Sequence, residues 1–286
     1  MTAVTFPIAP LRLSLRSAGM TFPAFSGSLW RGGLGMTLER RFRPAFDLLY
    51  GGSGDTRLYA LLPPQGHQPA DSSCELRLSL FGPATRHILA CTQAIAELGE
   101  RGIRSAGHYR LEAAAVITPA GDVRFFDAAD GLIAPPRPVD LRDYVTAPSG
   151  ARCMGVNLRT PMRLKEGNKL LESPPEFSQL IHRLLGRLQQ LAHVAGMPCP
   201  LPKQEHPPIV LEASRVVRIG ANLSEDGLSR RSGRTGQRMT FEGLHGSLRY
   251  HGDFSQTLPW LMAGRWLHLG GKSTFGFGAY DIDLFS

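Results

Sequence analysis

The stretch GRWLHLGGKSTFGFGAYDI, residues 264–282, contains five glycines among nineteen residues. Glycine loses more conformational freedom on folding than any other residue, so a cluster of this kind needs a structural reason. One reason is a loop whose bare backbone N–H groups approach a bound phosphate. The other is a tight turn beside the last strand, with no ligand. The remainder of the chain is needed to choose between these interpretations.

The charge of the 286-residue chain is the second informative feature, with a formal net charge of +8. Only four of its 32 basic residues are lysines, so 28 are arginines. The planar guanidinium group binds phosphate through two donors and stacks on bases, which the lysine ammonium cannot do. A genome rich in G and C would also favour arginine codons. The positive charge nevertheless indicates a polyanionic partner, and nucleic acid is the obvious one.

The composition is that of a soluble globular protein, with 42% hydrophobic and 8% aromatic residues. No stretch approaches the roughly 20 apolar residues of a membrane span, and the first residues lack the pattern of a signal peptide. The four cysteines are far apart and form no CxxC motif. Free thiols in a reducing cytosol fit this spacing better than disulfides or a zinc site. We therefore predict a cytoplasmic protein with no metal and no cofactor.

The first half of the chain alternates between strand and helix patterns. Residues 10–19, PLRLSLRSAG, place leucines on one face and basic side chains on the other, which is typical of a half-buried strand. A helix is predicted from residue 26 or 28 to residue 43, where Pro44 ends it. A second strand at residues 74–82 follows, and then an amphipathic helix and a hairpin at residues 83–102 and 108–127.

The pattern restarts after a proline-rich boundary at residues 132–145. Residues 151–164 are typical of a strand pair, and residues 174–196 form the most regular amphipathic helix. Strands are predicted at residues 209–220, at residues 237–252 and in the glycine-rich tail. These elements predict an α+β fold of two tandem ferredoxin-like (RRM-like) domains. We place the domains at residues 1–140 and 141–286, the second with the C-terminal glycine-rich loop.

Three segments concentrate groups that bind phosphate. They are the N-terminal strand and helix, the sequence LSRRSGRTGQR at residues 228–238, which we expect to be a loop, and the glycine-rich tail. A loop with four arginines is, taken alone, more typical of a solvated surface. Beside a glycine loop in a basic chain it favours phosphate contact, because N–H and guanidinium groups are complementary anion donors.

The glycine-rich tail resembles the C-terminal loop and last strand of the CRISPR repeat-processing endoribonucleases of the RAMP superfamily, which end in a pattern of the type GxWLHvGxxxSFGxGxY. Further segments resemble patterns of that family in the same order. They are FSGSLWRGGLGMTLER, then LRTPMRLKEGNKLL with PPEFSQLIHRLLGRL, then FEGLHGSLRY with LPWLMAG. The ordered set covers most of the chain.

The resemblance implies a metal-independent endoribonuclease that cleaves CRISPR precursor RNA within the repeat hairpin. The 2′-hydroxyl of the repeat attacks the adjacent phosphate, which leaves a 2′,3′-cyclic phosphate and a 5′-hydroxyl. The mature CRISPR RNA would stay bound, in a complex with other CRISPR subunits and without a membrane. In this interpretation the glycines let backbone amides approach an RNA phosphate.

The first helix departs from the family pattern at Met36, where many relatives place a catalytic histidine, and no histidine occurs before His67. This chain resembles the arginine-rich relatives without that histidine, such as those of type IV CRISPR systems. We expect arginines to bind the phosphate, to orient the 2′-hydroxyl and to leave proton transfer largely to water. The predicted catalytic residues are Arg16, Arg31 and Arg40, and for each of them a structural ion pair is the alternative.

The predicted RNA-binding residues come from the same three segments. The arginines of residues 228–238 would grip the stem of a repeat hairpin, because A-form RNA exposes mainly its phosphates and minor groove. Four aromatic side chains either stack on unpaired bases or belong to the core: Trp30, Phe275, Phe277 and Tyr280. The predicted RNA-binding set is Arg12, Arg41, Arg230, Arg231, Arg234, Arg238, His268, Gly270, Gly271, Lys272, Ser273 and Thr274.

Two other functions stay open at this point. A non-catalytic RNA-binding subunit of a CRISPR effector complex would explain the missing histidine, whereas the arginines of the first strand and helix favour an enzyme. A basic RRM-like RNA-binding protein unrelated to CRISPR is the third alternative.

Overall fold

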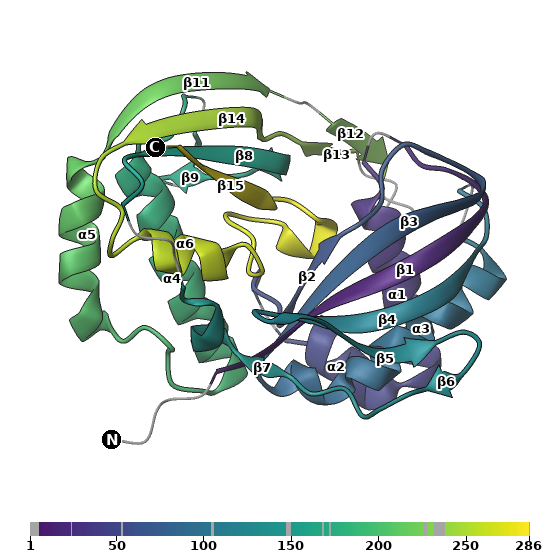
Figure 1. Ribbon diagram of the computed structural model, residues 1–286. Helices are drawn as coiled ribbons and strands as arrows, with labels where there is room; N and C mark the ends of the chain where they lie inside the picture. Colours follow the sequence, from purple (N-terminus) through teal and green to yellow (C-terminus); the bar gives the residue numbers. More distant parts are fainter. Residues whose placement is uncertain are drawn as a thin grey trace. The chain divides into compact units, whose positions relative to one another are not determined.

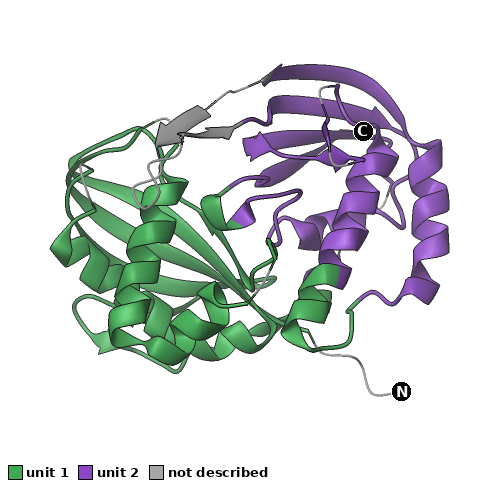
Figure 2. Ribbon diagram, turned by 180° about the vertical axis from the view of Figure 1, so that it is seen from behind, with its two compact units in different colours: residues 1–143, 190–200, 274–276 green, residues 144–189, 201–273, 277–286 purple. Residues whose placement is uncertain are grey.

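Figure 1 presents the computed structural model of the chain, which describes residues 6–23, 25–52, 54–103, 106–146, 150–167, 169–171, 173–225, 228–231 and 238–285. The chain divides into two compact units, which Figure 2 colours separately. Unit 1 comprises residues 1–143, 190–200 and 274–276, and unit 2 comprises residues 144–189, 201–273 and 277–286.

Unit 1 is built on an antiparallel sheet. Its strands are β1 (Pro7–Thr21), β2 (Tyr59–Leu62), β3 (His67–Phe81), β4 (Tyr109–Thr118), β5 (Gly121–Asp127), β6 (Gly131–Leu132) and β7 (Val139–Asp140). The order is β2-β3-β1-β4-β5-β6, with β7 paired to β1. Leu13 of β1 lies opposite Leu76 of β3 and Ala114 of β4. A first strand between the third and the fourth is the arrangement of a ferredoxin-like unit.

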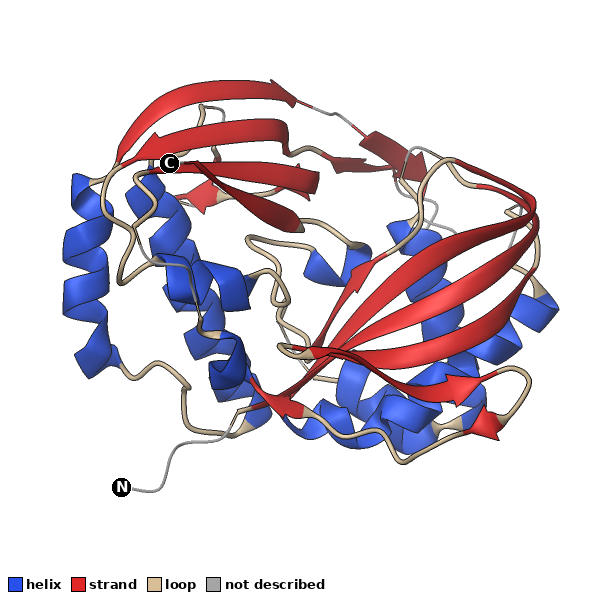
Figure 3. Ribbon diagram, in the orientation of Figure 1, coloured by secondary structure: helices blue, strands red, loops and turns tan. Residues whose placement is uncertain are grey.

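Helices cover one face of this sheet (Figure 3). They are α1 (Gly27–Arg41), α2 (Arg43–Tyr50), the short 3-10 helix η1 (Gly82–His87) and α3 (Ile88–Arg101). Glycines bring α1 close to its neighbours: a Cβ on Gly33 would lie 2.7 Å from Leu98 of α3, and one on Gly35 would lie 2.7 Å from the Tyr50 ring. Gly33 and Gly35 therefore serve close packing.

The first helix ends at Arg41, close to the predicted residue 43, but the role predicted for Pro44 is wrong. Pro44 does not end the helical segment, because it lies in the first turn of α2, which runs on to Tyr50. Proline suits that position, since its φ is already helical and the N–H that it lacks would have no partner there.

The alternation predicted for the first strand is confirmed at residues 11–17, and the strand itself extends beyond residues 10–19. Leu11, Leu13 and Leu15 are fully buried beneath the helices. Arg12 and Arg16 are half-buried and lie on the opposite, open face of the sheet. The strand at residues 74–82 and the hairpin at residues 108–127 are likewise confirmed as β3 and as β4 with β5.

Unit 2 repeats the topology of unit 1. Its main strands are β8 (Cys153–Met162), β11 (Val217–Glu225), β14 (Leu244–His251) and β15 (Tyr280–Phe285). They are antiparallel in the order β11-β14-β8-β15, with Val156 of β8 between Leu248 of β14 and Ile282 of β15. Two short hairpins join β9 (Lys165–Glu166) to β10 (Lys169–Leu170) and β12 (Leu228–Arg231) to β13 (Arg238–Phe241).

The apolar stripe predicted for the long central helix is confirmed. The helix is α4 (Phe177–Ala195), and Phe177, Ile181, Leu184 and Leu188 along it are each at most 2% exposed. The other helices of the second half are η3 (Lys203–Glu205), α5 (His206–Arg215), α6 (Leu258–Gly264) and η4 (Ser273–Phe275).

The strand predicted at residues 209–220 is wrong in its first half, where α5 replaces it and β11 begins only at Val217. Prolines stand in the first turn of α5, where they are tolerated. The buried positions of this segment follow the helical spacing of three and four residues and not strand alternation: Ile209, Glu212 and Ala213.

The α+β class with two ferredoxin-like units and a C-terminal glycine-rich loop is thus confirmed. The loop, residues 265–279, connects α6 to β15, and the short 3-10 helix η2 (Leu141–Tyr144) lies where unit 1 passes into unit 2 along the chain. No helix in the part of the chain that the structure describes is long and apolar enough to span a membrane.

Candidate nucleic-acid interface

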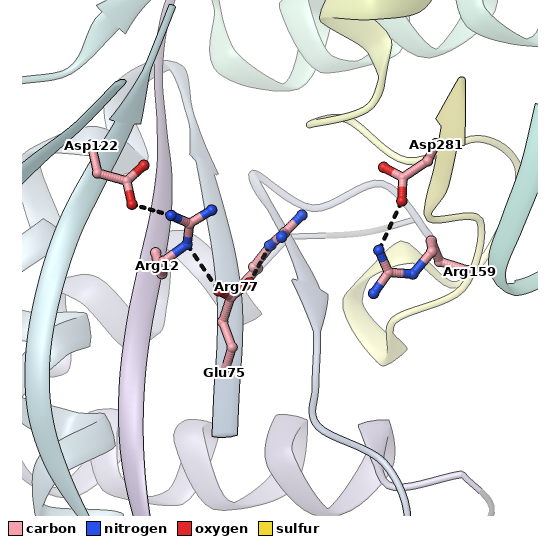
Figure 4. A network of polar contacts seen from close by, with 6 residues as sticks. All are labelled: Arg12, Glu75, Arg77, Asp122, Arg159 and Asp281. Carbon is pink, nitrogen blue, oxygen red and sulfur yellow. Dashed lines mark hydrogen bonds and ion pairs between the residues drawn. The ribbon is translucent and has the colours of Figure 1, made fainter. Parts of the chain in front are cut away.

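Arg12 belongs to a network of opposite charges on the open sheet face of unit 1 (Figure 4). Its Nε lies 2.8 Å from Oε2 of Glu75 on β3, and its Nη1 donates a hydrogen bond to Asp122 on β5. Glu75 also accepts a hydrogen bond from Arg77 on the same strand. Carboxylates therefore balance the arginine charges at this position.

Arg16 lies four residues after Arg12 on the same face of β1 and also forms an ion pair. Its Nε donates to Oε1 of Glu112 at 2.7 Å, and its Nη1 donates to the Asp71 carbonyl oxygen at 2.7 Å. The hydrogen bond to Glu112 raises the pKa of Arg16, so the guanidinium stays charged and paired. Arg110 approaches the same Glu112 oxygen at 3.8 Å.

A hollow of about 780 Å³ over this sheet carries both signs of charge. Its charged lining residues are Glu75, Arg110, Glu112, Arg124 and Asp127. Arg124 is itself bound to Asp127, with 2.9 Å between Nη1 and Oδ2. Acidic groups outnumber basic ones in this lining, so the hollow is not suited to collecting phosphates.

The arginines at the end of α1 share a single carboxylate. Nη2 of Arg40 lies 3.1 Å from Oε2 of Glu97 on α3, and Nε of Arg41 lies 3.3 Å from its Oε1. The pairs are exposed and tie α1 to α3. Met36, at the position where the family pattern has histidine, is 50% exposed on the same helix.

Arg31 differs from the other predicted arginines. Within the described residues no carboxylate forms an ion pair with its guanidinium, which lies 4.7 Å from the ring centre of Phe275 and 5.4 Å from that of Tyr50. Its Nε is buried without a hydrogen-bond partner. The Tyr50 hydroxyl donates to the Arg31 carbonyl oxygen at 2.7 Å and fixes this turn of α1. Among the described residues the charge of Arg31, beside Phe275, therefore has no carboxylate partner.

The two tyrosines near Arg31 are neutral. Burial raises the pKa of both Tyr50 and Tyr59, and the positive charge of Arg31 only partly opposes this. Because neither hydroxyl ionises near neutral pH, neither can neutralise the guanidinium.

The start of α1 packs directly on residues 274–276 of the glycine loop. A Cβ on Gly27 would lie 1.7 Å from the carbonyl oxygen of Phe275, and one on Gly276 would lie 2.8 Å from Pro63. Only glycine permits such a close approach. The packing of Gly27 on Phe275 thereby fixes the ring on which Arg31 rests.

The remaining glycines of the loop act within unit 2. Gly270 has φ +83° and Gly278 has φ +75°, and a Cβ on either would collide with a backbone carbonyl, that of Arg163 at 2.3 Å or that of Leu269 at 1.8 Å. The amides of Gly271 and Gly278 donate to the carbonyl oxygens of Arg163 and Pro161, both at 2.9 Å. Tight turning thus accounts for Gly270 and Gly278, while Gly271 is exposed and a Cβ on it would lie 4.0 Å from the Arg163 carbonyl oxygen.

The polar side chains of the loop are mostly internal. His268 is 5% exposed, and its Nδ1 donates to the Phe277 carbonyl oxygen at 3.0 Å. Ser273 and Thr274 are also buried, at 5% and 6% exposure. Lys272 is half-buried and has φ +66°, a strained conformation for a side chain other than glycine.

Sequence reasoning missed one residue that contacts this loop. Arg187 of α4 is 7% exposed, and its Nη2 donates to Oγ of Ser273 at 2.9 Å. A signal for it existed in the sequence: Arg187 stands three residues after Leu184 and four before Leu191, inside the apolar stripe of the helix. A cation in such a stripe needs a buried partner.

The segment at residues 228–238 is not the open loop that we expected. Leu228–Arg231 and Arg238–Phe241 pair as the antiparallel strands β12 and β13, with Arg231 opposite Arg238. Polar and apolar residues alternate in the second run, residues 238–241, which is typical of a strand. Arg230, Arg231 and Arg238 lie in this hairpin, with side chains outside what the structure describes, and Arg234 lies outside the described residues.

The aromatic side chains divide between the core and the loop. Trp30, Phe277 and Tyr280 are at most 2% exposed and belong to the core, whereas Phe275 is half-buried. On the sheet of unit 2, Arg159 is bound to Asp281 at 2.7 Å (Figure 4). Arg159 is thus paired in the same manner as Arg12 and Arg16.

The family model for the CRISPR-associated endoribonuclease Cas6 matches residues 156–280, from within β8 to the first residue of β15. No curated protein matches the sequence. Among solved structures, a Cas6 product complex has 17% sequence identity and a TM-score of 0.62, over 97% of this chain and all of that chain.

Two further structures have the same fold. Cas6 of Thermus thermophilus has 16% identity and a TM-score of 0.60, over 99% of this chain and all of that one. A partial complex of Cas6-RT-Cas1 with Cas2 has 11% identity and a TM-score of 0.65, over 99% of this chain and 47% of that one. The resemblance to the CRISPR repeat-processing endoribonucleases is thereby confirmed, with the glycine loop inside the matched region.

Proposed function

We propose that the protein binds CRISPR repeat RNA and cleaves it without a metal ion, with Arg31 as the catalytic residue that binds the scissile phosphate. The match to the Cas6 family supports repeat RNA as the substrate. Solved proteins of this fold include Cas6 product and substrate-mimic complexes, which further supports RNA as the ligand.

One observation carries the choice of Arg31. Its guanidinium lies over Phe275 of the glycine loop and is the member of the predicted catalytic set that forms no ion pair with a carboxylate of the described chain. A phosphate can therefore bind to it without displacing an internal anion. Arg16 and Arg40 would first have to leave Glu112 and Glu97, and this favours a structural role for both.

The proposed reaction requires positioning and charge stabilisation more than a strong base. The 2′-oxygen attacks phosphorus and forms the new O–P bond, while the bond from phosphorus to the 5′-oxygen breaks. The 2′-hydroxyl proton passes to water, and the leaving 5′-oxygen takes a proton from water. Arg31 stabilises the charge that accumulates on the non-bridging oxygens, an effect worth roughly 10²–10³ in rate for a single well-placed donor.

The proposal assigns separate roles to the other predicted RNA contacts. Lys272 of the loop contacts a backbone phosphate, whereas the amide of Gly271 is already donated to the Arg163 carbonyl oxygen. The arginines of the β12–β13 segment hold the stem of the hairpin through its backbone. The product, with its 2′,3′-cyclic phosphate, stays bound and joins other subunits of an effector complex.

The test uses repeat RNA incubated with purified protein in EDTA, under single-turnover conditions. We expect one cut, a cyclic-phosphate end and full activity in EDTA for the wild type and for Arg16→Ala. Arg31→Ala should slow cleavage by about 100-fold, as expected for the loss of one transition-state donor. Loss of activity in EDTA, or equal activity of Arg31→Ala, would contradict the proposal.

A second function is favoured by Met36, which is exposed where the family pattern has histidine and cannot transfer a proton. In this alternative the protein is a non-catalytic subunit that binds CRISPR RNA. Tight binding of repeat RNA by the wild type with no cleavage at any pH between 6 and 9 would establish it in place of the enzyme.

A further inference from the structure

Arg187 forms hydrogen bonds with two residues of the glycine loop, Leu267 and Ser273. Its Nη2 donates to Oγ of Ser273 at 2.9 Å, and its Nε donates to the carbonyl oxygen of Leu267 at 3.3 Å. Both acceptors are neutral, and burial lowers the pKa of Arg187 to about 10. A buried guanidinium is costly unless its donors are bonded, and two of the Arg187 donors are bonded to this loop.

The segment between those two acceptors is strained. His268 has φ +59° and Lys272 has φ +66°, although neither is glycine. Such conformations cost about 1–3 kcal/mol each and persist only where surrounding contacts enforce them. The bonds of Arg187 enclose both residues, because Leu267 precedes His268 and Ser273 follows Lys272.

We propose that Arg187 is a positioning residue that holds residues 267–273 in the conformation that presents Lys272 to RNA phosphate, with Ser273 as its anchor and not as an RNA contact. This inference rests on the proposed RNA-binding role of the loop. Arg187 does not touch RNA, since it is buried beneath the loop.

The first measurement needs no RNA. Amide hydrogen exchange is followed in the wild type, Arg187→Met, Arg187→Lys and Ser273→Ala. In Arg187→Met we expect the loop amides of residues 267–273 to exchange about tenfold faster, because local opening costs less free energy. Arg187→Lys retains the positive charge and one donor nitrogen, so it should recover part of the protection against exchange. Unchanged exchange of the loop in folded Arg187→Met would overturn the proposal.

The second measurement records the salt dependence of binding to uncleavable repeat RNA. Each lost phosphate contact lowers the slope of log K against log salt by roughly 0.7–0.9. We expect the slope of Arg187→Met to fall by about one contact, even though the removed charge never met a phosphate. An unchanged slope would overturn the proposal, since a residue with a merely structural role leaves it as it is.

Ile181→Ala is the matched control, because Ile181 is 1% exposed on the same helix and its truncation lowers stability without touching the loop bonds. It should keep the wild-type slope and show no selective exchange in the loop. If it reproduces both effects of Arg187→Met, the loop responds to stability in general and the proposal fails. If the wild type binds no repeat RNA, the proposed function fails, while the exchange measurement still decides whether Arg187 holds the loop.

Discussion

Two regions of unit 1 carry arginines in opposite surroundings. On the open sheet face, Arg12 and Arg16 lie among Glu75, Glu112 and Asp122, and every one of these carboxylates is bound to a guanidinium. At the start of α1, Arg31 rests on the rings of Tyr50 and Phe275 and has no carboxylate bound to it among the described residues. In the first region carboxylates balance the arginine charges, whereas in the second region the guanidinium remains available to bind an anion.

The difference shows why a count of arginines does not locate a phosphate site. Arginine forms equally good bidentate bonds with a carboxylate and with a phosphate. A guanidinium already bound to a carboxylate gains little by exchanging it for RNA, whereas one stacked on aromatic rings gains a full ion pair. The distribution of acidic side chains on neighbouring strands therefore decides which arginines remain available to an external anion.

The largest expected effect comes from separating α1 from the loop by Gly27→Ala. The new Cβ would lie 1.7 Å from the Phe275 carbonyl oxygen, so the helix and the loop must move apart. We expect a loss of about 3 kcal/mol in the free energy of unfolding, in the range of severe overpacking. Urea denaturation measures the loss, and cleavage of repeat RNA should fall with it at temperatures where the variant is folded.

Gly32→Ala is the control on the same helix, because no atom lies within 4 Å of its Cβ position. It should stabilise the protein by about 1 kcal/mol through helix propensity. If Gly27→Ala behaves like Gly32→Ala, the packing of α1 on Phe275 is not what holds the Arg31 region.

A second, smaller effect is expected when a carboxylate is removed from the sheet face. Glu112→Gln releases Arg16 and Arg110 from their carboxylate on the sheet face. We expect the affinity for RNA to rise a few-fold, with a slope of log K against log salt that is steeper by about one contact. Filter binding between low and moderate salt measures both quantities.

Asp47→Asn makes the same change of net charge, since it releases Arg43 on the exposed side of α2. It should alter affinity less than Glu112→Gln does. Equal increases in RNA affinity for both variants would mean that binding depends on net charge alone. This result would contradict the difference between the two regions.

The smallest expected effect tests the hydroxyl that supports Arg31. Tyr50→Phe removes the bond to the Arg31 carbonyl oxygen and should cost about 1 kcal/mol of stability. Tyr109→Phe removes a similar bond to the Ile95 carbonyl oxygen and should cost as much. Only Tyr50→Phe should also slow cleavage in single-turnover assays, by a few-fold. Equal cleavage rates in the two variants would mean that the Tyr50 hydroxyl does not support the proposed catalytic role of Arg31.

The sequence was sufficient for the elements whose periodicity is long and regular. The leucines of β1 and the apolar stripe of α4 predicted a strand and a helix that the structure contains. Short elements were harder, because α5 is rich in residues that also suit strands, and the spacing of Ile209, Glu212 and Ala213 is visible only over a few positions. The start of α2 at Arg43 likewise depends on whether the chain continues as a helix after Pro44.

The candidate site was less accessible to sequence reasoning. The pairing of Arg16 with Glu112 joins residues 96 positions apart, and the contact of Arg31 with Phe275 joins residues still further apart. Such distant contacts follow from strand order and register, which no local pattern contains. The glycines of residues 264–282 correctly predicted close approach of the backbone. Only the structure shows that Gly270 and Gly278 lie against carbonyl groups, whereas Gly271 is exposed.

The most direct test of the contrast is the salt dependence of binding to a repeat RNA with a 2′-deoxy nucleotide at the cleavage site, measured for Arg31→Ala beside Arg16→Ala. Uncleavable RNA makes the result independent of catalysis. The account predicts a slope reduced by about one phosphate contact for Arg31→Ala and an unchanged slope for Arg16→Ala. A reduced slope for Arg16→Ala with an unchanged slope for Arg31→Ala would contradict it, and would place the RNA phosphate on the sheet face.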